Sequence, residues 1–113
     1  SIDIPQSFNE LVSEINSGNF KYKNILILTS IHTEIEEIKK IIKNESNDIS
    51  DFNDMKSGIN IMYGDPFKPF YIKNRDLIVV HKESMDGIDS FVLNESISCC
   101  VIWCLRYVFI EPS

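Results

Sequence analysis

The chain has 113 residues, of which 43% are hydrophobic and 25% are charged, and its formal net charge is −6 at pH 7. This length and apolar content predict one folded domain over residues 1–113 and exclude a disordered chain. The acidic balance and the scattered basic residues argue against direct binding to DNA or RNA, because phosphates require a basic face. No run approaches the roughly 20 apolar residues of a membrane span. We therefore expect no membrane association and an intracellular location, cytoplasmic or nuclear.

The cysteine and histidine content speaks against disulfides and metal sites. Cys99, Cys100 and Cys104 are close together in the sequence, and their odd number does not form a disulfide framework. The only histidines are His32 and His81, and no C-x-x-C pair is present. We therefore predict buried free thiols in a reducing compartment, with no metal and no cofactor.

The N-terminal segment predicts a helix over residues 7–18 with both ends marked. Ser7 followed by Glu10 is a capping box, and Gly18 is well placed to end the helix. The spacing of one buried face is followed by Phe8, Leu11, Val12 and Ile15.

A strand and a second capped helix follow, which is the opening of a β-α-β unit. Residues 24–29 form a continuous apolar run, which is typical of a parallel strand buried on both faces. Residues 33–43 predict a helix, with Thr33 and Glu36 as a second capping box. Its expected apolar stripe is Ile35, Ile38, Ile41 and Ile42.

The remainder alternates between apolar runs and polar connections. We expect surface loop over 44–57, a polar turn over 83–89 and an aromatic loop over 67–71, whose rings either pack on the core or form a partner-binding lip. Residues 91–98 are ambiguous. Further strands are expected over 59–63, 76–81, 99–103 and 107–110. The sequence thus predicts an α/β fold: a three-layer domain with a mainly parallel sheet of four to five strands and a sheet core over 23–110.

The sequence contains none of the glycine-rich phosphate loops, nucleophile elbows or H-E-x-x-H zinc motifs. Candidate chemistry is therefore positional, because open parallel sheets hold ligands beyond the carboxyl ends of their strands. His81 and Asp65 are candidates for a catalytic acid–base pair if their loops are adjacent. The alternative is that His81 simply ends a strand and is hydrogen-bonded or solvated.

Taken in order, these segments resemble the second RecA-like domain of superfamily 2 helicases. The resemblance rests on Lys23–Ser30 with the helix after it, on the strand ending at Gly64, and on the strand that leads into Gly87-Ile88-Asp89. It implies a RecA- or Rossmann-like fold. It also implies ligand contacts by Thr29 and Ser30 with a nucleic-acid phosphate, and by Gly87 and Asp89 with a nucleotide. The chain departs from the family where Asp86 takes the place of an arginine, and the arginine-rich ATP motif has no counterpart.

We therefore expect a non-catalytic, helicase-like scaffold that binds a protein partner or a second copy of itself, in a nucleic-acid-processing or chromatin complex. The residues predicted to carry the interaction are Phe67, Phe70, Tyr71, Trp103 and Phe109. One alternative is a small enzyme built on His81, Asp65 and Asp89. Another is an acidic viral or bacterial inhibitor that uses Asp48, Asp51 and Asp54. A receiver-like domain is disfavoured, because Thr29-Ser30 stands where receivers cluster acidic residues.

Overall fold

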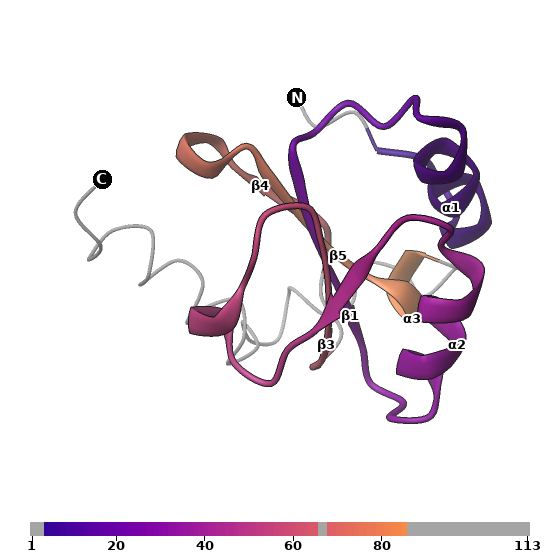
Figure 1. Ribbon diagram of the computed structural model, residues 1–113, viewed down its shortest axis with the longest axis vertical. Helices are drawn as coiled ribbons and strands as arrows, with labels where there is room; N and C mark the ends of the chain where they lie inside the picture. The colour runs from indigo at the N-terminus through magenta and orange to yellow at the C-terminus, as the bar shows by residue number, and fades with distance from the viewer. Residues whose placement is uncertain (1–3, 66–67, 86–113) are drawn as a thin grey trace.

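The computed structural model describes residues 4–65 and 68–85 (Figure 1). The elements in chain order are α1 (Phe8–Ser17), β1 (Asn24–Thr29), α2 (Glu34–Ile41), β2 (Ser46–Asp48), the 3-10 helix η1 (Phe52–Asp54), β3 (Ile59–Tyr63), β4 (Phe70–Ile72), the 3-10 helix η2 (Lys73–Arg75), β5 (Leu77–His81) and α3 (Lys82–Met85). The expected strands over 99–103 and 107–110 lie outside the described residues, as do all three cysteines, Phe67, Gly87, Asp89, Trp103 and Phe109.

The described strands form one mixed sheet in the order β2-β3-β1-β5-β4. The pairs β2–β3, β3–β1 and β1–β5 are parallel, whereas β4 pairs antiparallel with β5 at one edge. The prediction of an α/β domain with a mainly parallel sheet is therefore confirmed. Two of its five strands, β2 and β4, come from segments that the sequence predicted as loops.

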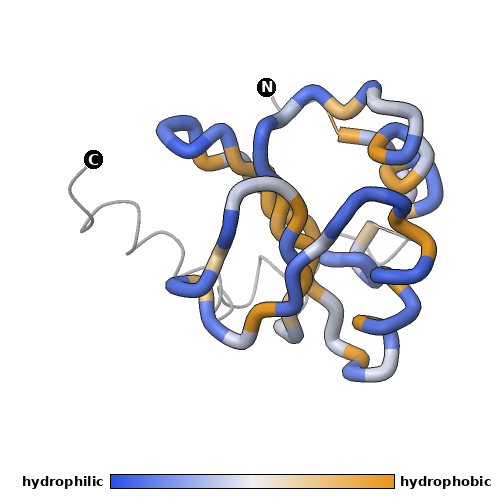
Figure 2. The backbone as a smooth tube through the Cα atoms, in the orientation of Figure 1, coloured by the Kyte–Doolittle hydropathy of each residue, from blue (hydrophilic) through white to orange (hydrophobic). Residues whose placement is uncertain are grey.

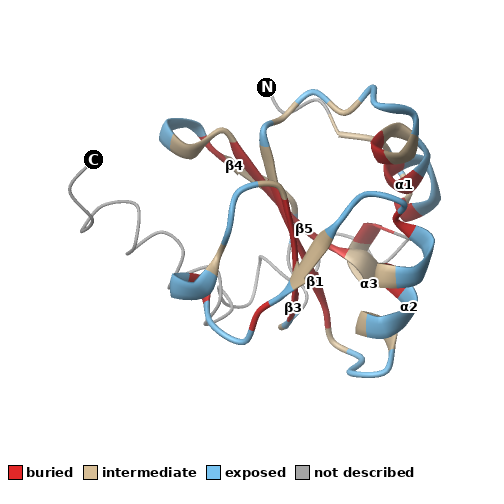
Figure 3. Ribbon diagram, in the orientation of Figure 1, coloured by how far each residue is buried: buried red, intermediate tan, exposed pale blue. Residues whose placement is uncertain are grey.

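The central strands are buried on both faces, as their continuous apolar sequences predicted (Figures 2 and 3). Successive side chains of a strand point to opposite faces. Accordingly, Ile25 and Ile27 of β1 join one buried cluster, and Leu26 and Leu28 join another.

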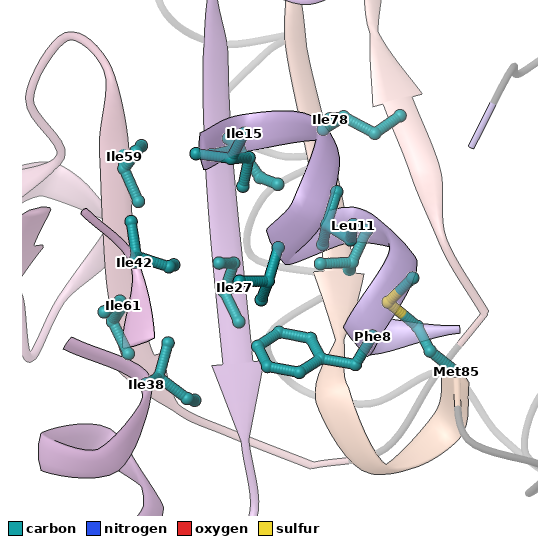
Figure 4. Close-up of a cluster of buried hydrophobic side chains, with 13 residues drawn as sticks. Phe8, Leu11, Ile15, Ile27, Ile38, Ile42, Ile59, Ile61, Ile78 and Met85 are labelled. Carbon is teal, nitrogen blue, oxygen red and sulfur yellow. The ribbon is translucent and has the colours of Figure 1, made fainter. Parts of the chain in front are cut away.

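Helices α1, α2 and α3 contribute to the first of these clusters. Phe8 and Leu11 of α1 face Ile27 of β1, while Ile38 of α2 lies beside Ile61 of β3 (Figure 4). Figure 1 shows the three helices on the same side of the sheet. The second cluster, on the opposite face, includes Ile49, Phe52 of η1 and Ile72 of β4.

The ends of α1 agree with the sequence prediction. The Ser7 hydroxyl accepts a hydrogen bond from the Glu10 backbone N–H at 3.2 Å, which satisfies one of the free donors at the helix start. Gly18 closes the helix with φ +80°, a left-handed conformation that glycine adopts without steric cost.

Helix α2 differs from its prediction in its cap and in its stripe. Thr33 already has helical dihedral angles and makes no side-chain cap hydrogen bond, so the expected capping box with Glu36 does not form. Ile38 and Ile42 are buried, but Ile41 is 44% exposed. The helix ends at Ile41, so the expected extension to residue 43 is also wrong.

Three expected connections contain regular structure instead. The acidic segment 44–57 holds β2 and η1, and residues 70–71 of the aromatic segment belong to β4. The start of the expected polar turn over 83–89 is helical, because α3 runs to Met85. None of the helices in the described part of the chain has the length and apolar run that crossing a membrane requires.

Candidate functional site

The carboxyl ends of β1, β3 and β5 lie side by side, because these three parallel strands are neighbours. The chain leaves β1 toward β3 on one side and later returns to β5 on the other side. The boundary between β1 and β5 is therefore the place where the direction of the chain across the sheet reverses. Ligands of open α/β sheets bind at such a point, so this edge is the candidate site.

The carboxylate of Glu83, in α3, bridges from β5 to the end of β1. One oxygen accepts a hydrogen bond from the Thr29 hydroxyl at 2.7 Å. The other accepts from the Ser30 backbone N–H at 2.9 Å and from the Ser30 hydroxyl at 3.1 Å. The donors that follow β1, which the helicase resemblance assigns to a phosphate, are thus bound by the protein's own carboxylate.

These contacts keep the Glu83 carboxylate ionised. Burial by itself raises the pKa of Glu83, but the hydrogen bonds from Ser30 and Thr29 and the nearby His81 ring together lower it below its ordinary value of 4.5. The donors outweigh burial because a hydrogen bond to a charged acceptor is stronger than one to a neutral acceptor. The edge therefore carries a negative charge whose two oxygens accept hydrogen bonds from Thr29 and Ser30.

His81 ends β5 and is completely buried. Its Nδ1 accepts from the Ser84 backbone N–H at 3.3 Å, and its Nε2 lies 3.1 Å from the Gly64 carbonyl oxygen. A ring that accepts through Nδ1 carries its proton on Nε2, so His81 is neutral and donates to Gly64. Burial lowers the pKa of His81 below 6.5, although the charges of Glu83 and Asp65 act in the opposite direction.

The ring of His81 contacts the first turn of helix α3. The bond from the Ser84 N–H is the type that an N-cap side chain makes with the first turn of a helix, here α3. Asp65 is exposed, and its charge is close enough to raise the pKa of His81. The structure thus brings the two predicted residues to one edge but binds the His81 ring to Gly64 and Ser84.

The outer surface of this edge is formed by the loop after β1 and by the end of β3. The rings of His32 and Tyr63 stack face to face, with centroids 3.8 Å apart and planes at 4°. Ile31 and Tyr63 are each 47% exposed. We call Ile31, His32 and Tyr63 the edge patch.

Two predicted interaction residues take part in packing. Phe70 packs against the second core cluster, while Tyr71 packs against the first and donates to Asp76 Oδ1 at 2.7 Å. The roles of Glu83 and of the edge patch were not predicted. A strand-end position was the only sequence signal for Glu83, because its partners lie 53 and 54 residues away.

Among the described residues, no group of three or more His, Cys, Asp or Glu side chains is arranged to hold a metal ion. Comparison of the chain with family models, curated proteins and solved structures gives no match.

Proposed function

We propose that this chain is a non-catalytic α/β module that binds another protein, or a second copy of itself, through the carboxyl edge of its sheet. The observation that carries the proposal is the state of this edge. The Thr29 hydroxyl and the Ser30 N–H donate to Glu83, and the outer surface presents the edge patch.

The inner part of the edge supports a role without catalysis. A general base must reach a substrate proton, but His81 is completely buried and both of its ring nitrogens contact the protein. Thr29 is also completely buried and donates to Glu83. A phosphate that used these donors would have to displace the carboxylate.

The outer part of the edge supports recognition of a protein. Aromatic side chains are enriched in protein interfaces, and here the exposed Tyr63 ring stacks on His32, which follows the exposed Ile31 in the chain. The stacked His32 and Tyr63 rings hold each other in place, so they lose little conformational freedom when a partner binds.

The acidic-inhibitor alternative has weaker support. Asp48 forms an ion pair with Lys39 at 3.2 Å, and Asp51 caps η1 by accepting from the Asn53 N–H at 2.8 Å. Two of the three proposed mimic carboxylates thus make contacts within the chain, while both residues stay exposed. Kinship with helicase second domains stays part of the proposal. The parallel order β3-β1-β5 is compatible with it.

The proposal is tested with a matched pair of isoleucines. Ile31, in the edge patch, is 47% exposed, and Ile41, at the end of α2, is 44% exposed. Each is changed to serine, and proteins retained from source cells are quantified beside the mass of the pure chain in solution. Wild type and Ile41→Ser should retain the same partner or the same dimer, while Ile31→Ser should lose it by about tenfold or more.

Three results would overturn the proposal. In the first, Ile31→Ser binds as wild type does. In the second, wild type is a monomer that retains nothing beyond what a variant lacking the whole edge patch retains. In the third, calorimetry shows micromolar binding of ATP to the wild-type chain that Asp89→Ala abolishes, which would mean that the chain is a nucleotide-binding domain.

A further inference from the structure

A second candidate site lies at the amino ends of the parallel strands, opposite the carboxyl ends that form the first site. A cavity of about 330 Å³ opens at the amino ends of β1 and β3, where α1 ends and the segment leading to β2 begins. This volume is at the lower end of the range of small-molecule sites. None of the groups at the carboxyl edge lines this cavity.

The cavity has a mixed lining, in which Ile15, Phe20, Tyr22, Ile25 and Ile59 form the apolar and aromatic part. Ile15, Ile25 and Ile59 belong to the buried cluster, and Figure 4 shows Ile15 and Ile59 toward the same end of it. Phe20 and Tyr22 add two half-buried rings, which meet edge to face with centroids 5.5 Å apart. A further ring placed here would extend an existing series of aromatic contacts, each of which favours such offset or edge-on geometry.

Two of the residues that line the cavity are glycines. Gly18 and Gly58 both line it, with φ values of +80° and +95° that favour glycine. A methyl group built at either position would meet no atom within 4 Å.

The entrance carries balanced charge. Lys23, Asn44 and Glu45 are all exposed and line the cavity. One positive and one negative side chain give no net attraction for an anion, and the chain as a whole has a net charge of −6. A nucleotide or another phosphate-bearing ligand is therefore disfavoured, whereas an uncharged or zwitterionic molecule is not.

The geometry points to a binding site for a small aromatic molecule of one or two rings and no net charge. The ring would lie on Ile15, Ile25 and Ile59 beside Phe20 and Tyr22, and any polar substituent would face the entrance. This inference is independent of the proposed function, because the two sites use different edges of the sheet.

The test uses four probes that share one ring system and differ in charge: indole, tryptophan, tryptamine and indole-3-acetate. Each is titrated into the isotope-labelled full chain and followed by NMR. Indole should bind with a dissociation constant on the order of 1 mM and shift the amides of Gly18, Tyr22 and Gly58. Zwitterionic tryptophan should bind at least as tightly as the anion indole-3-acetate.

A blocking variant fixes the location. Asn44→Trp places a large side chain at the entrance from an exposed position, and Asn53→Trp, at an exposed position of η1, is the matched control. Indole binding should weaken about tenfold or more in Asn44→Trp and stay unchanged in Asn53→Trp. The inference is refuted if indole causes no saturable shifts in wild type, if the shifts map elsewhere, or if a folded Asn44→Trp binds indole as wild type does. Much tighter binding of indole-3-acetate would refute the charge argument. The wild-type shift map decides the question by itself if Asn44→Trp does not fold.

Discussion

Removal of the Glu83 carboxylate should destabilise the domain far more than removal of an ordinary surface glutamate. In Glu83→Ala, the Thr29 hydroxyl and the Ser30 N–H lose an acceptor at 2.7 and 2.9 Å, and the Ser30 hydroxyl loses one at 3.1 Å. A hydrogen bond to a charged group contributes about 1.5 to 3 kcal/mol. Water can replace some of this, because Ser30 is only half-buried, whereas Thr29 is completely buried. We therefore expect a loss of about 3 kcal/mol rather than the sum of three bonds.

The matched control is Glu37→Ala. Glu37 forms an exposed pair with Lys40 at 3.5 Å, and its side chain is 58% exposed. Its removal should change the free energy of unfolding by less than about 0.5 kcal/mol. Urea unfolding followed by far-UV circular dichroism at pH 7 measures both variants. If Glu83→Ala loses no more stability than Glu37→Ala, the account of the carboxyl edge is wrong.

The same carboxylate sets a pH dependence. Because the folded state lowers the pKa of Glu83 below 4.5, the unfolded chain takes up this proton first as the pH falls. The stability from Glu83 is therefore complete above about pH 5.5 and is lost as the pH falls through the lower folded value. With His81→Gln present in both chains, so that the titration of His81 does not contribute, the loss of stability caused by Glu83→Gln should be constant above that pH and shrink below it. An unchanged difference down to acid unfolding would contradict the assignment.

The titration of His81 should lower the stability of the chain at a higher pH than the titration of Glu83 does. Burial lowers the pKa of His81 from 6.5, so the unfolded chain binds a proton below that pH before the folded chain does. Wild-type stability should thus begin to fall below about pH 6.5, and His81→Gln should remove that part of the slope.

Three further substitutions test single contacts: the hydrogen bonds of Asn60, the close approach of Gly64 to Leu28, and the hydrogen bond of Tyr71. Asn60→Leu should lower the free energy of unfolding, measured in urea, by about 2 kcal/mol. The completely buried Asn60 side chain donates a hydrogen bond at 2.7 Å and accepts one at 2.9 Å, and leucine can make neither. An unchanged free energy of unfolding would show that solvent replaces these bonds. Gly64→Ala should cost about 1 to 3 kcal/mol by overpacking, since its added methyl overlaps the Leu28 side chain, and Leu28→Val in the same chain should recover part of the loss. A hydrogen bond to Asp76 raises the pKa of Tyr71 above 10.0, so the stability from this bond is complete below that pH and is lost as the pH rises through the folded value. Tyr71→Phe should remove this alkaline dependence, and an alkaline phenolate titration unchanged by Asp76→Asn would argue against the bond.

The central strands and the first helix could be predicted because their signals are local. The apolar runs of β1 and β5 have no alternation, which fits strands covered on both faces. Ser7 and Gly18 mark the ends of α1 through residues that suit those dihedral angles. The second capping box failed because Thr33 has helical rather than extended backbone, so its hydroxyl is not placed as a cap.

The two edge strands could not be predicted, because each is only three residues long and pairs with a single neighbouring strand. β2 is the polar tripeptide Ser46–Asp48, and it pairs along β3. β4 follows a proline, and a tight turn at Asp76, with φ +47°, leads from η2 into β5. A strand of three residues is too short for its periodicity to be recognised.

The candidate site was predicted only in outline. The expectation that candidate residues lie at strand ends placed Thr29, Ser30 and His81 near one another, and in the structure they lie at neighbouring strand ends. Their binding or catalytic roles stay predictions. The bond of Glu83 to Thr29 joins residues 54 positions apart, and the stack of His32 on Tyr63 depends on the β1–β3 register. Pairings of this kind follow from the sheet order, which the sequence does not state.

The most direct test of the central claim is photo-crosslinking from the edge patch. A photoreactive phenylalanine analogue replaces Tyr63 in one chain and Ile41 in another, two positions of similar exposure, 47% and 44%. The account predicts a defined adduct from position 63, either with one partner protein or with a second copy of the chain, and no such adduct from position 41. The same adduct from both positions, or an adduct from position 41 alone, would contradict the proposal that the carboxyl edge is the docking surface.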